Sequence, residues 1–104
     1  MIRVVWEFRV RKGMEAEFES RYSSYGAWAR LFAKSDGYGG TTLLRDPAEA
    51  RRYLVIDLWR DAAALAAFKQ AHAAEYAALD EDCESLTESE VHVGTFEPLR
   101  DSSR

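Results

Sequence analysis

The sequence predicts an α+β domain in which two helices cover one face of a four-stranded antiparallel sheet. Four segments have strand patterns, with a period of two in the first and the last, and hydrophobic residues recur every three or four residues in two longer segments. These segments follow one another in the order β-α-β-β-α-β and occupy almost all of the 104 residues. Because helices on one face leave the other face of the sheet bare, this order also predicts a partner that covers it.

The first strand and the first helix follow from the N-terminal periodicities. Apolar residues alternate over residues 2–10, so this segment has one dry face, and a Lys-Gly pair at 12–13 ends it. An amphipathic helical pattern then runs over residues 14–32. Two serines and a glycine within residues 23–26 interrupt the pattern, and we expect a kink or a break there.

The middle of the chain predicts two strands joined by a turn. Residues 38–45 form the second strand, with a weak point or bulge at Gly39-Gly40, and residues 52–59 form the third. The proline within residues 46–50 excludes a continuous strand. Since the third strand is apolar on both faces apart from Asp57, we expect a central strand that is covered on both sides.

The second helix has the clearest helical pattern in the chain. Asp61 is a favourable N-cap, and apolar residues then recur at steps of three and four from Leu65 to Leu86. We expect fraying near the acidic residues 80–82 or an earlier helix end, because negative charge late in a helix opposes its macrodipole. Alternation over residues 91–96 predicts the last strand.

Composition restricts the classes of function. The length predicts one domain, residues 1–99, followed by a flexible tail at 100–104. A net charge of −4 without a basic stripe argues against a nucleic-acid partner. No apolar stretch approaches the ~20 residues that cross a bilayer, and no signal-peptide pattern is visible. Together with a lone cysteine, Cys83, these features predict a cytoplasmic protein without membrane contact.

Two polar side chains on apolar faces are the candidate catalytic residues. Asp57 shares a strand face with Tyr53 and Trp59, because strand side chains alternate. A buried carboxylate needs a partner or a raised pKa, so Asp57 is either a general base or a paired structural group. His72 lies in the apolar stripe of the second helix and is either a base or a core histidine. Two histidines without ligand spacing argue against a metal site.

Aromatic side chains make up 12% of the chain, which is enough to wall a pocket for a flat apolar ligand. A filled core has the same pattern, so both interpretations stay open. The candidate pocket residues are Trp6, Trp28, Trp59, Tyr53, Phe68 and Tyr76.

The span from residue 2 to residue 98 resembles the antibiotic biosynthesis monooxygenase (ABM) family of dimeric α+β barrel proteins. The matching pieces, in order, are residues 10–13, 36–38, 43–46 and 57–59, followed by His72. The resemblance implies a ferredoxin-like βαββαβ fold. It also implies a homodimer, in which two sheets from two chains close face to face into a barrel.

The resemblance further implies a monooxygenase that oxidises a phenol, anthrone or quinol with O₂ and without a cofactor. Carried onto this chain, Trp59 matches the pocket tryptophan at the end of the third strand. Asp57 stands where the family often has an acidic residue, and His72 lies near the histidine of the second helix. A haem-degrading branch has an asparagine where this chain has Trp6, which argues against haem.

Two other functions are compatible with the same residues. One is a dimer of this fold that binds a small apolar molecule without turnover. The other is a structural dimer whose own side chains fill the pocket.

Overall fold

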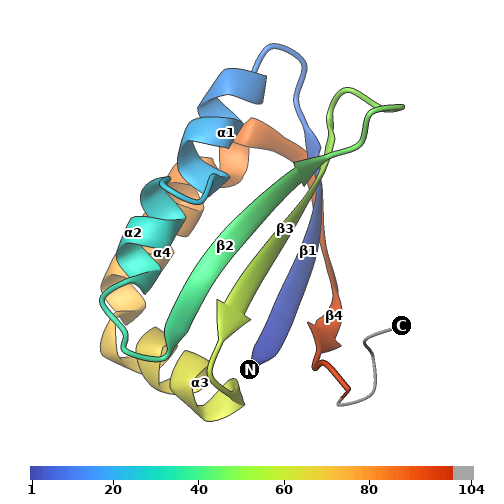
Figure 1. Ribbon diagram of the computed structural model, residues 1–104. Helices are drawn as coiled ribbons and strands as arrows, with labels where there is room; N and C mark the ends of the chain where they lie inside the picture. Colours follow the sequence, from blue (N-terminus) through green and yellow to red (C-terminus); the bar gives the residue numbers. More distant parts are fainter. Residues whose placement is uncertain (100–104) are drawn as a thin grey trace.

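The computed structural model describes residues 1–99, and the tail predicted at 100–104 lies outside the described residues. The predicted order of strands and helices is confirmed, and Figure 1 shows the helices on one face of the sheet. The elements are β1 (Ile2–Val10), α1 (Glu15–Tyr22), α2 (Ala27–Phe32), β2 (Tyr38–Arg45), β3 (Arg52–Trp59), α3 (Ala62–Ala71), α4 (Ala73–Cys83), the 3₁₀ turn η1 (Glu84–Leu86) and β4 (Thr87–Phe96). None of the helices in this part of the chain has the length and apolar character needed to span a membrane.

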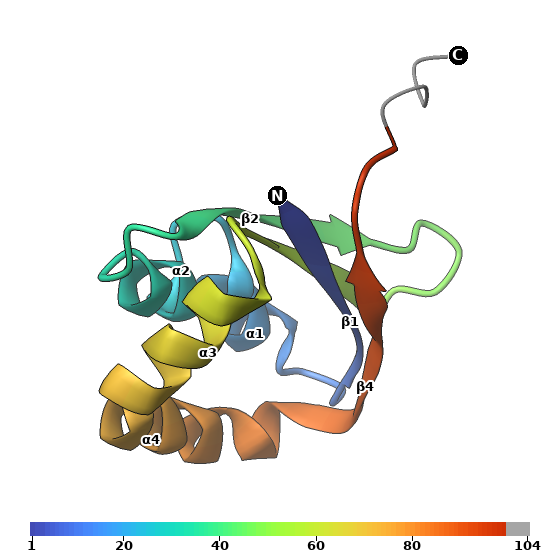
Figure 2. The same cartoon turned by 90° about the horizontal axis from the view of Figure 1, so that it is seen from below.

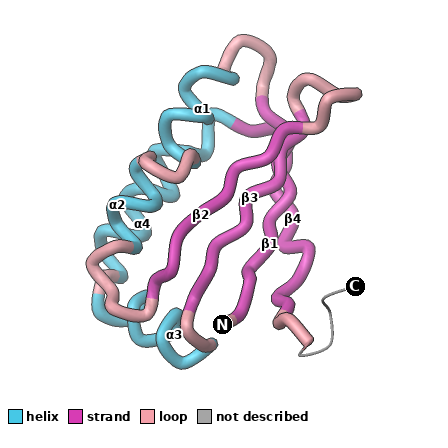
Figure 3. The backbone as a smooth tube through the Cα atoms, in the orientation of Figure 1, coloured by secondary structure: helices cyan, strands magenta, loops and turns pink. Residues whose placement is uncertain are grey.

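The described strands form one antiparallel sheet in the order β2-β3-β1-β4, which confirms the ferredoxin-like arrangement. β3 and β1 are the central strands, as Figure 3 shows, so the prediction of a central third strand is confirmed. Along β3, residues alternate between buried and half-buried positions. Every second side chain therefore faces the helices, and the side chains between them face away.

Two glycines explain local breaks that the sequence predicted. The first helical segment is divided into α1 and α2 at Gly26, where an added Cβ would lie 2.6 Å from the carbonyl oxygen of Arg21. Only glycine allows so close a turn. In β2, Gly40 has a φ of +124°, and the pairing with β3 shifts between Tyr38 and Gly40. This irregularity confirms the expected bulge.

The second helical segment differs from its prediction. Asp61 is the N-cap, and its Oδ1 accepts a hydrogen bond of 2.8 Å from the Ala64 amide, as expected. The prediction of one continuous helix was wrong, however, because α3 ends at His72 and α4 begins there in a new direction (Figure 2). α3 packs on β3 and α4 packs on α2, so the chain must bend between them. α4 continues through the acidic residues 80–82 to Cys83, and β4 begins at Thr87 rather than at residue 91.

The core lies between the sheet and the helices. Its largest fully enclosed side chains are those of Trp59, Tyr53, Phe18 and Val10. Ring stacking continues through the layer, with Phe18 and Tyr22 only 4.3 Å apart between ring centroids. Burial of this many rings supplies most of the hydrophobic stabilisation of so small a domain.

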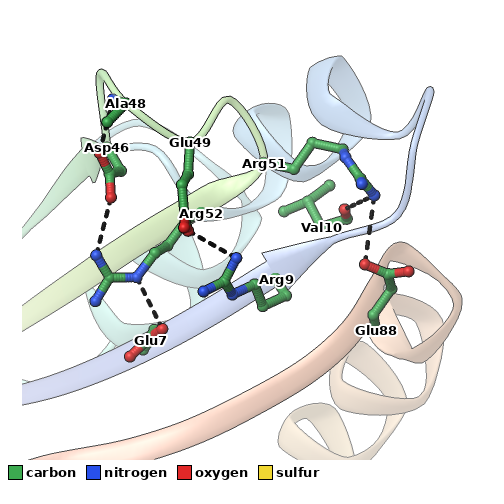
Figure 4. Close-up of polar contacts among 9 residues, drawn as sticks. All are labelled: Glu7, Arg9, Val10, Asp46, Ala48, Glu49, Arg51, Arg52 and Glu88. Atoms are coloured by element: carbon green, nitrogen blue, oxygen red, sulfur yellow. Dashed lines mark hydrogen bonds and ion pairs between the residues drawn. The ribbon is translucent and has the colours of Figure 1, made fainter.

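The opposite face of the sheet, called here the outer face, carries apolar side chains that no described residue covers. Leu54, Ile56 and Leu58 of β3 are only half-buried, and Leu44 of β2 and Val91 of β4 on the same face are exposed. Ion pairs border this face where β2 and β3 meet the turn between them, as Figure 4 shows. There the Arg52 guanidinium lies 2.9 Å from Glu7 and 2.9 Å from Asp46.

Candidate functional site

A cavity of about 60 Å³ lies between the helix-facing side of the sheet and helices α1, α2 and α4. Rings make up much of its wall, and carboxyl groups come from three elements. The lining residues are Trp6, Phe8, Tyr22, Trp28, Phe32, Thr41, Val55, Asp57, Tyr76, Asp80 and Glu90. The wall therefore combines a flat apolar surface with several groups that can accept a proton.

Asp57 is the most buried carboxyl group of this wall, with 8% of its surface exposed. The Thr41 hydroxyl donates a 2.6 Å hydrogen bond to Asp57 Oδ1. The Tyr38 hydroxyl lies 2.5 Å from Thr41 Oγ1, and it is the donor there because Thr41 has already given its proton to Asp57. This chain of three side chains fixes the orientation of the carboxyl group.

The second oxygen of Asp57, Oδ2, forms no hydrogen bond with any of residues 1–99, and it is not enclosed by protein. Since Asp57 lines the cavity, a ligand there can reach this oxygen. Burial raises the pKa of Asp57 to about 6, against the opposing effect of the Thr41 hydrogen bond. A carboxylate with this pKa is ionised at pH 7 and is a stronger base than an exposed aspartate.

Sheet register places Thr41 beside Asp57, because the two residues are direct partners across β2 and β3. Sequence reasoning missed Thr41, because counting outward from the predicted strand ends at residues 45 and 52 pairs it with Ile56, one residue from its observed partner. It also missed Glu90, because the last strand begins earlier than predicted. The first omission concerns pairing between strands, and the second concerns the start of a strand.

Three of the predicted pocket residues line the cavity: Trp6 from β1, Trp28 from α2 and Tyr76 from α4. Trp28 and Tyr76 meet edge to face with ring centroids 5.1 Å apart. The Tyr76 hydroxyl forms no hydrogen bond within residues 1–99 and is not fully enclosed. Burial raises its pKa, as do Asp80, Glu90 and Asp57, so negative charge surrounds this hydroxyl.

The other three predicted pocket residues do not line this cavity. Trp59 is 1% exposed and packs against Phe32 and Phe68, at 5.3 and 5.5 Å between ring centroids. Tyr53 is also buried in the core, and its hydroxyl donates a 2.6 Å hydrogen bond to Glu19. These rings support the cavity wall from behind.

His72 lies away from the cavity, at the bend between α3 and α4. Its Nδ1 is 2.9 Å from Glu75 Oε1, and its ring lies 5.0 Å from that of Phe68. It lines a shallow hollow on the other side of Phe68, together with Lys34 and Arg60. The two candidate catalytic residues, Asp57 and His72, therefore do not share a cavity, and Asp57 alone lies beside the aromatic wall.

Comparisons with known proteins agree with the fold. The family model described as antibiotic biosynthesis monooxygenase matches residues 1–79. SnoaB, a cofactor-independent oxygenase from Streptomyces nogalater, is 27% identical and has a TM-score of 0.77, with 99% of this chain and 97% of that chain covered. No curated protein sequence matches the chain.

Two further structures share the fold alone. PA3566 from Pseudomonas aeruginosa is 20% identical with a TM-score of 0.69, over 94% of this chain and 93% of that chain. Rv0793 from Mycobacterium tuberculosis is 14% identical with a TM-score of 0.70, over 98% of each chain.

Proposed function

Because the chain belongs to the antibiotic biosynthesis monooxygenase family, we propose that it oxidises an aromatic hydroxyl compound of the phenol, anthrone or quinol type with O₂ and without a cofactor. The observation that carries the proposal is the Asp57 carboxyl group. One oxygen is held by Thr41, and the other is unbonded beside the aromatic wall. The likeness to SnoaB, a cofactor-independent oxygenase, supports the reaction type.

Asp57 Oδ2 is the proposed general base. It removes a proton from the substrate, and the resulting anion transfers an electron to O₂. For an anthrone, the carbon radical and superoxide then combine, and loss of water leaves a carbonyl group. One oxygen atom ends in the product and the other in water, so the substrate supplies all four electrons.

The aromatic wall supports this chemistry in two ways. Trp6 and Trp28 offer flat surfaces on which a conjugated anion can stack. Burial of Asp57 raises its pKa and so its basicity, and a site with little water protects a reactive intermediate. The Tyr76 hydroxyl is available to donate a hydrogen bond to a developing oxyanion.

A homodimer that closes through the outer face is the second part of the proposal. Leu54, Ile56 and Leu58 would be buried against the same strand of a second copy. Removing such an apolar sheet face from water is favourable by roughly 25 cal/mol per Å². The ion pairs of Arg52 would then form part of the polar border of the interface.

Oxygen consumption tests the reaction. Wild type, Asp57→Asn and His72→Ala are incubated aerobically with a panel of anthrones, hydroquinones and naphthols. We expect wild type to accelerate O₂ uptake with at least one compound. In that reaction Asp57→Asn lowers the rate by about 10² or more, the usual contribution of a general base. Labelled ¹⁸O₂ places one labelled atom in the product.

The His72→Ala variant separates the two candidate bases. We expect its rate to match wild type, since His72 does not line the cavity. Loss of activity in His72→Ala with an intact rate in Asp57→Asn would reverse the assignment. Saturable binding without O₂ uptake throughout the panel would favour the ligand-binding alternative.

A further inference from the structure

A second hollow of about 260 Å³ adjoins the cavity and shares three of its lining residues, Tyr22, Asp80 and Glu90. We call the two spaces the inner cavity and the acidic hollow. Figure 2 shows that α4 leads through η1 directly into β4, so one continuous segment supplies most of the wall of the acidic hollow. The inner cavity alone is smaller than the roughly 150 Å³ that holds one benzene molecule. A ligand therefore has to extend into the acidic hollow.

The acidic hollow differs sharply in charge from an ordinary aromatic pocket. Four carboxyl groups line it, from Asp80, Glu84, Glu88 and Glu90. No lysine, arginine or histidine within residues 1–99 lines either space. Glu88 pairs with Arg51 at 3.3 Å, whereas Asp80, Glu84 and Glu90 form no ion pair within that part of the chain.

Two basic side chains that contact α4 do not line the acidic hollow. Arg21 pairs with Glu17 at 2.9 Å and with Asp82 at 3.2 Å. The Lys69 Nζ lies 5.4 Å from the Tyr76 ring centroid and does not line either space. Asp80, Glu84 and Glu90 thus lack a counter-charge within the described residues 1–99.

The uncompensated negative charge affects the pKa of Glu90. Burial raises the pKa of its carboxyl group, and repulsion from Asp80 and Glu84 raises it further. A cation placed among these three groups would relieve the repulsion, whereas an anionic ligand would add to it. The charge of the wall therefore selects the charge of the ligand.

We propose that this site takes an aromatic hydroxyl compound that carries a protonated amine. The hydroxyl-bearing edge of the ring enters the inner cavity beside Asp57, the rest of the ring extends into the acidic hollow, and the ammonium group lies among Asp80, Glu84 and Glu90. The unbonded Asp57 oxygen and the free Tyr76 hydroxyl give the inner cavity its own polar contacts for a ring hydroxyl. The inference rests on the proposed function for its ring chemistry, and it adds the charge of the substrate.

Three matched hydroxyindoles test the inference by calorimetry without oxygen. Serotonin carries an ammonium group, 5-hydroxytryptophol a neutral hydroxyl and 5-hydroxyindole-3-acetate a carboxylate on a similar ring. We expect serotonin to bind at least about tenfold more tightly than the alcohol, and the carboxylate to bind most weakly. Higher ionic strength should reduce these differences. Equal affinities for the amine and the alcohol, or no binding of serotonin at millimolar concentration, would overturn the inference.

Variants that each remove one negative charge test which carboxyl groups cause the preference for the amine. Asp80→Asn and Glu90→Gln should each lower the preference for serotonin over the alcohol. Glu81→Gln makes the same change of charge on α4 but lines neither space, so its preference should equal that of wild type. A similar loss in Glu81→Gln would assign the effect to net charge and overturn the inference.

Binding and turnover have separate outcomes. An amine preference without O₂ uptake by any compound would support this inference and contradict the proposed oxidation. Uptake with neutral phenols and no amine preference would contradict the inference alone.

Discussion

Replacing Asp57 with asparagine should change how the stability of the protein depends on pH. The pKa of Asp57 is about 6 in the folded chain, against an ordinary value of 3.8. Between these values the folded state binds more protons than the unfolded state. The stability that the protonated carboxyl group contributes is therefore complete below about pH 4 and is lost as the pH rises through 6.

The size of this effect follows from the difference between the two pKa values. A difference of about 2 pH units corresponds to about 3 kcal/mol in the free energy of unfolding. About 2 kcal/mol of this stability is lost between pH 4.5 and pH 7.5. This range avoids the lower pH values at which protonation of other groups causes acid denaturation. Asparagine keeps an acceptor for the Thr41 hydroxyl but does not titrate. The free energy of unfolding of the variant should therefore not show this decrease with rising pH.

Urea denaturation at several pH values measures the effect. The free energy of unfolding of wild type minus that of Asp57→Asn should fall by about 2 kcal/mol from pH 4.5 to pH 7.5. All other titrating groups cancel in the difference if protein concentration is held fixed. A flat curve for Asp57→Asn would refute the raised pKa and weaken the role of Asp57 as a base.

Three further predictions follow from the same contacts. Thr41→Val removes the hydrogen bond to the Asp57 carboxylate, so the pKa of Asp57 should rise by roughly 1–2 pH units. Carbon NMR titrations measure this pKa, and Thr41→Ser should return it to the wild-type value. Ile56→Lys places a charge on the outer face and should halve the molecular mass that sedimentation gives for the proposed homodimer. Ala66→Lys, at an exposed position of α3, should leave the mass unchanged. An unchanged mass for both variants would argue against a dimer interface on the outer face. Burial leaves Cys83 2% exposed and raises its pKa, so an aromatic disulfide reagent should modify it far more slowly in native protein than in urea; equal rates would contradict its burial.

Local patterns in the sequence were sufficient to predict the framework. The period of two over β1 and the apolar run over β3 identified these strands, and the alternation of strand side chains gave the face to which Asp57 belongs. Gly26 and Gly40 marked real irregularities, because close approach and positive φ depend mainly on the absence of a side chain. These features can be read locally because each depends on residues near one another in the chain.

The helix bend at His72 and the composition of the cavity were decided only by the tertiary structure. His72 and Phe68 continue the same helical stripe as Tyr76, yet α3 packs on β3 while α4 packs on α2. The stripe is thus divided between two environments, and His72 is directed away from Asp57.

The sequence by itself determined the order of strands and helices and the dry face of β1, but not the break at His72 or the start of β4. It could not determine which buried aromatic residue lines a space and which fills one. Trp28 borders the cavity while Trp59 lies in the core, although both are large apolar rings on buried faces. The physical reason is that a cavity is the space left unfilled between side chains that come from several strands and helices. That outcome depends on contacts such as Thr41 with Asp57, which are distant in sequence and exist only after the sheet has formed.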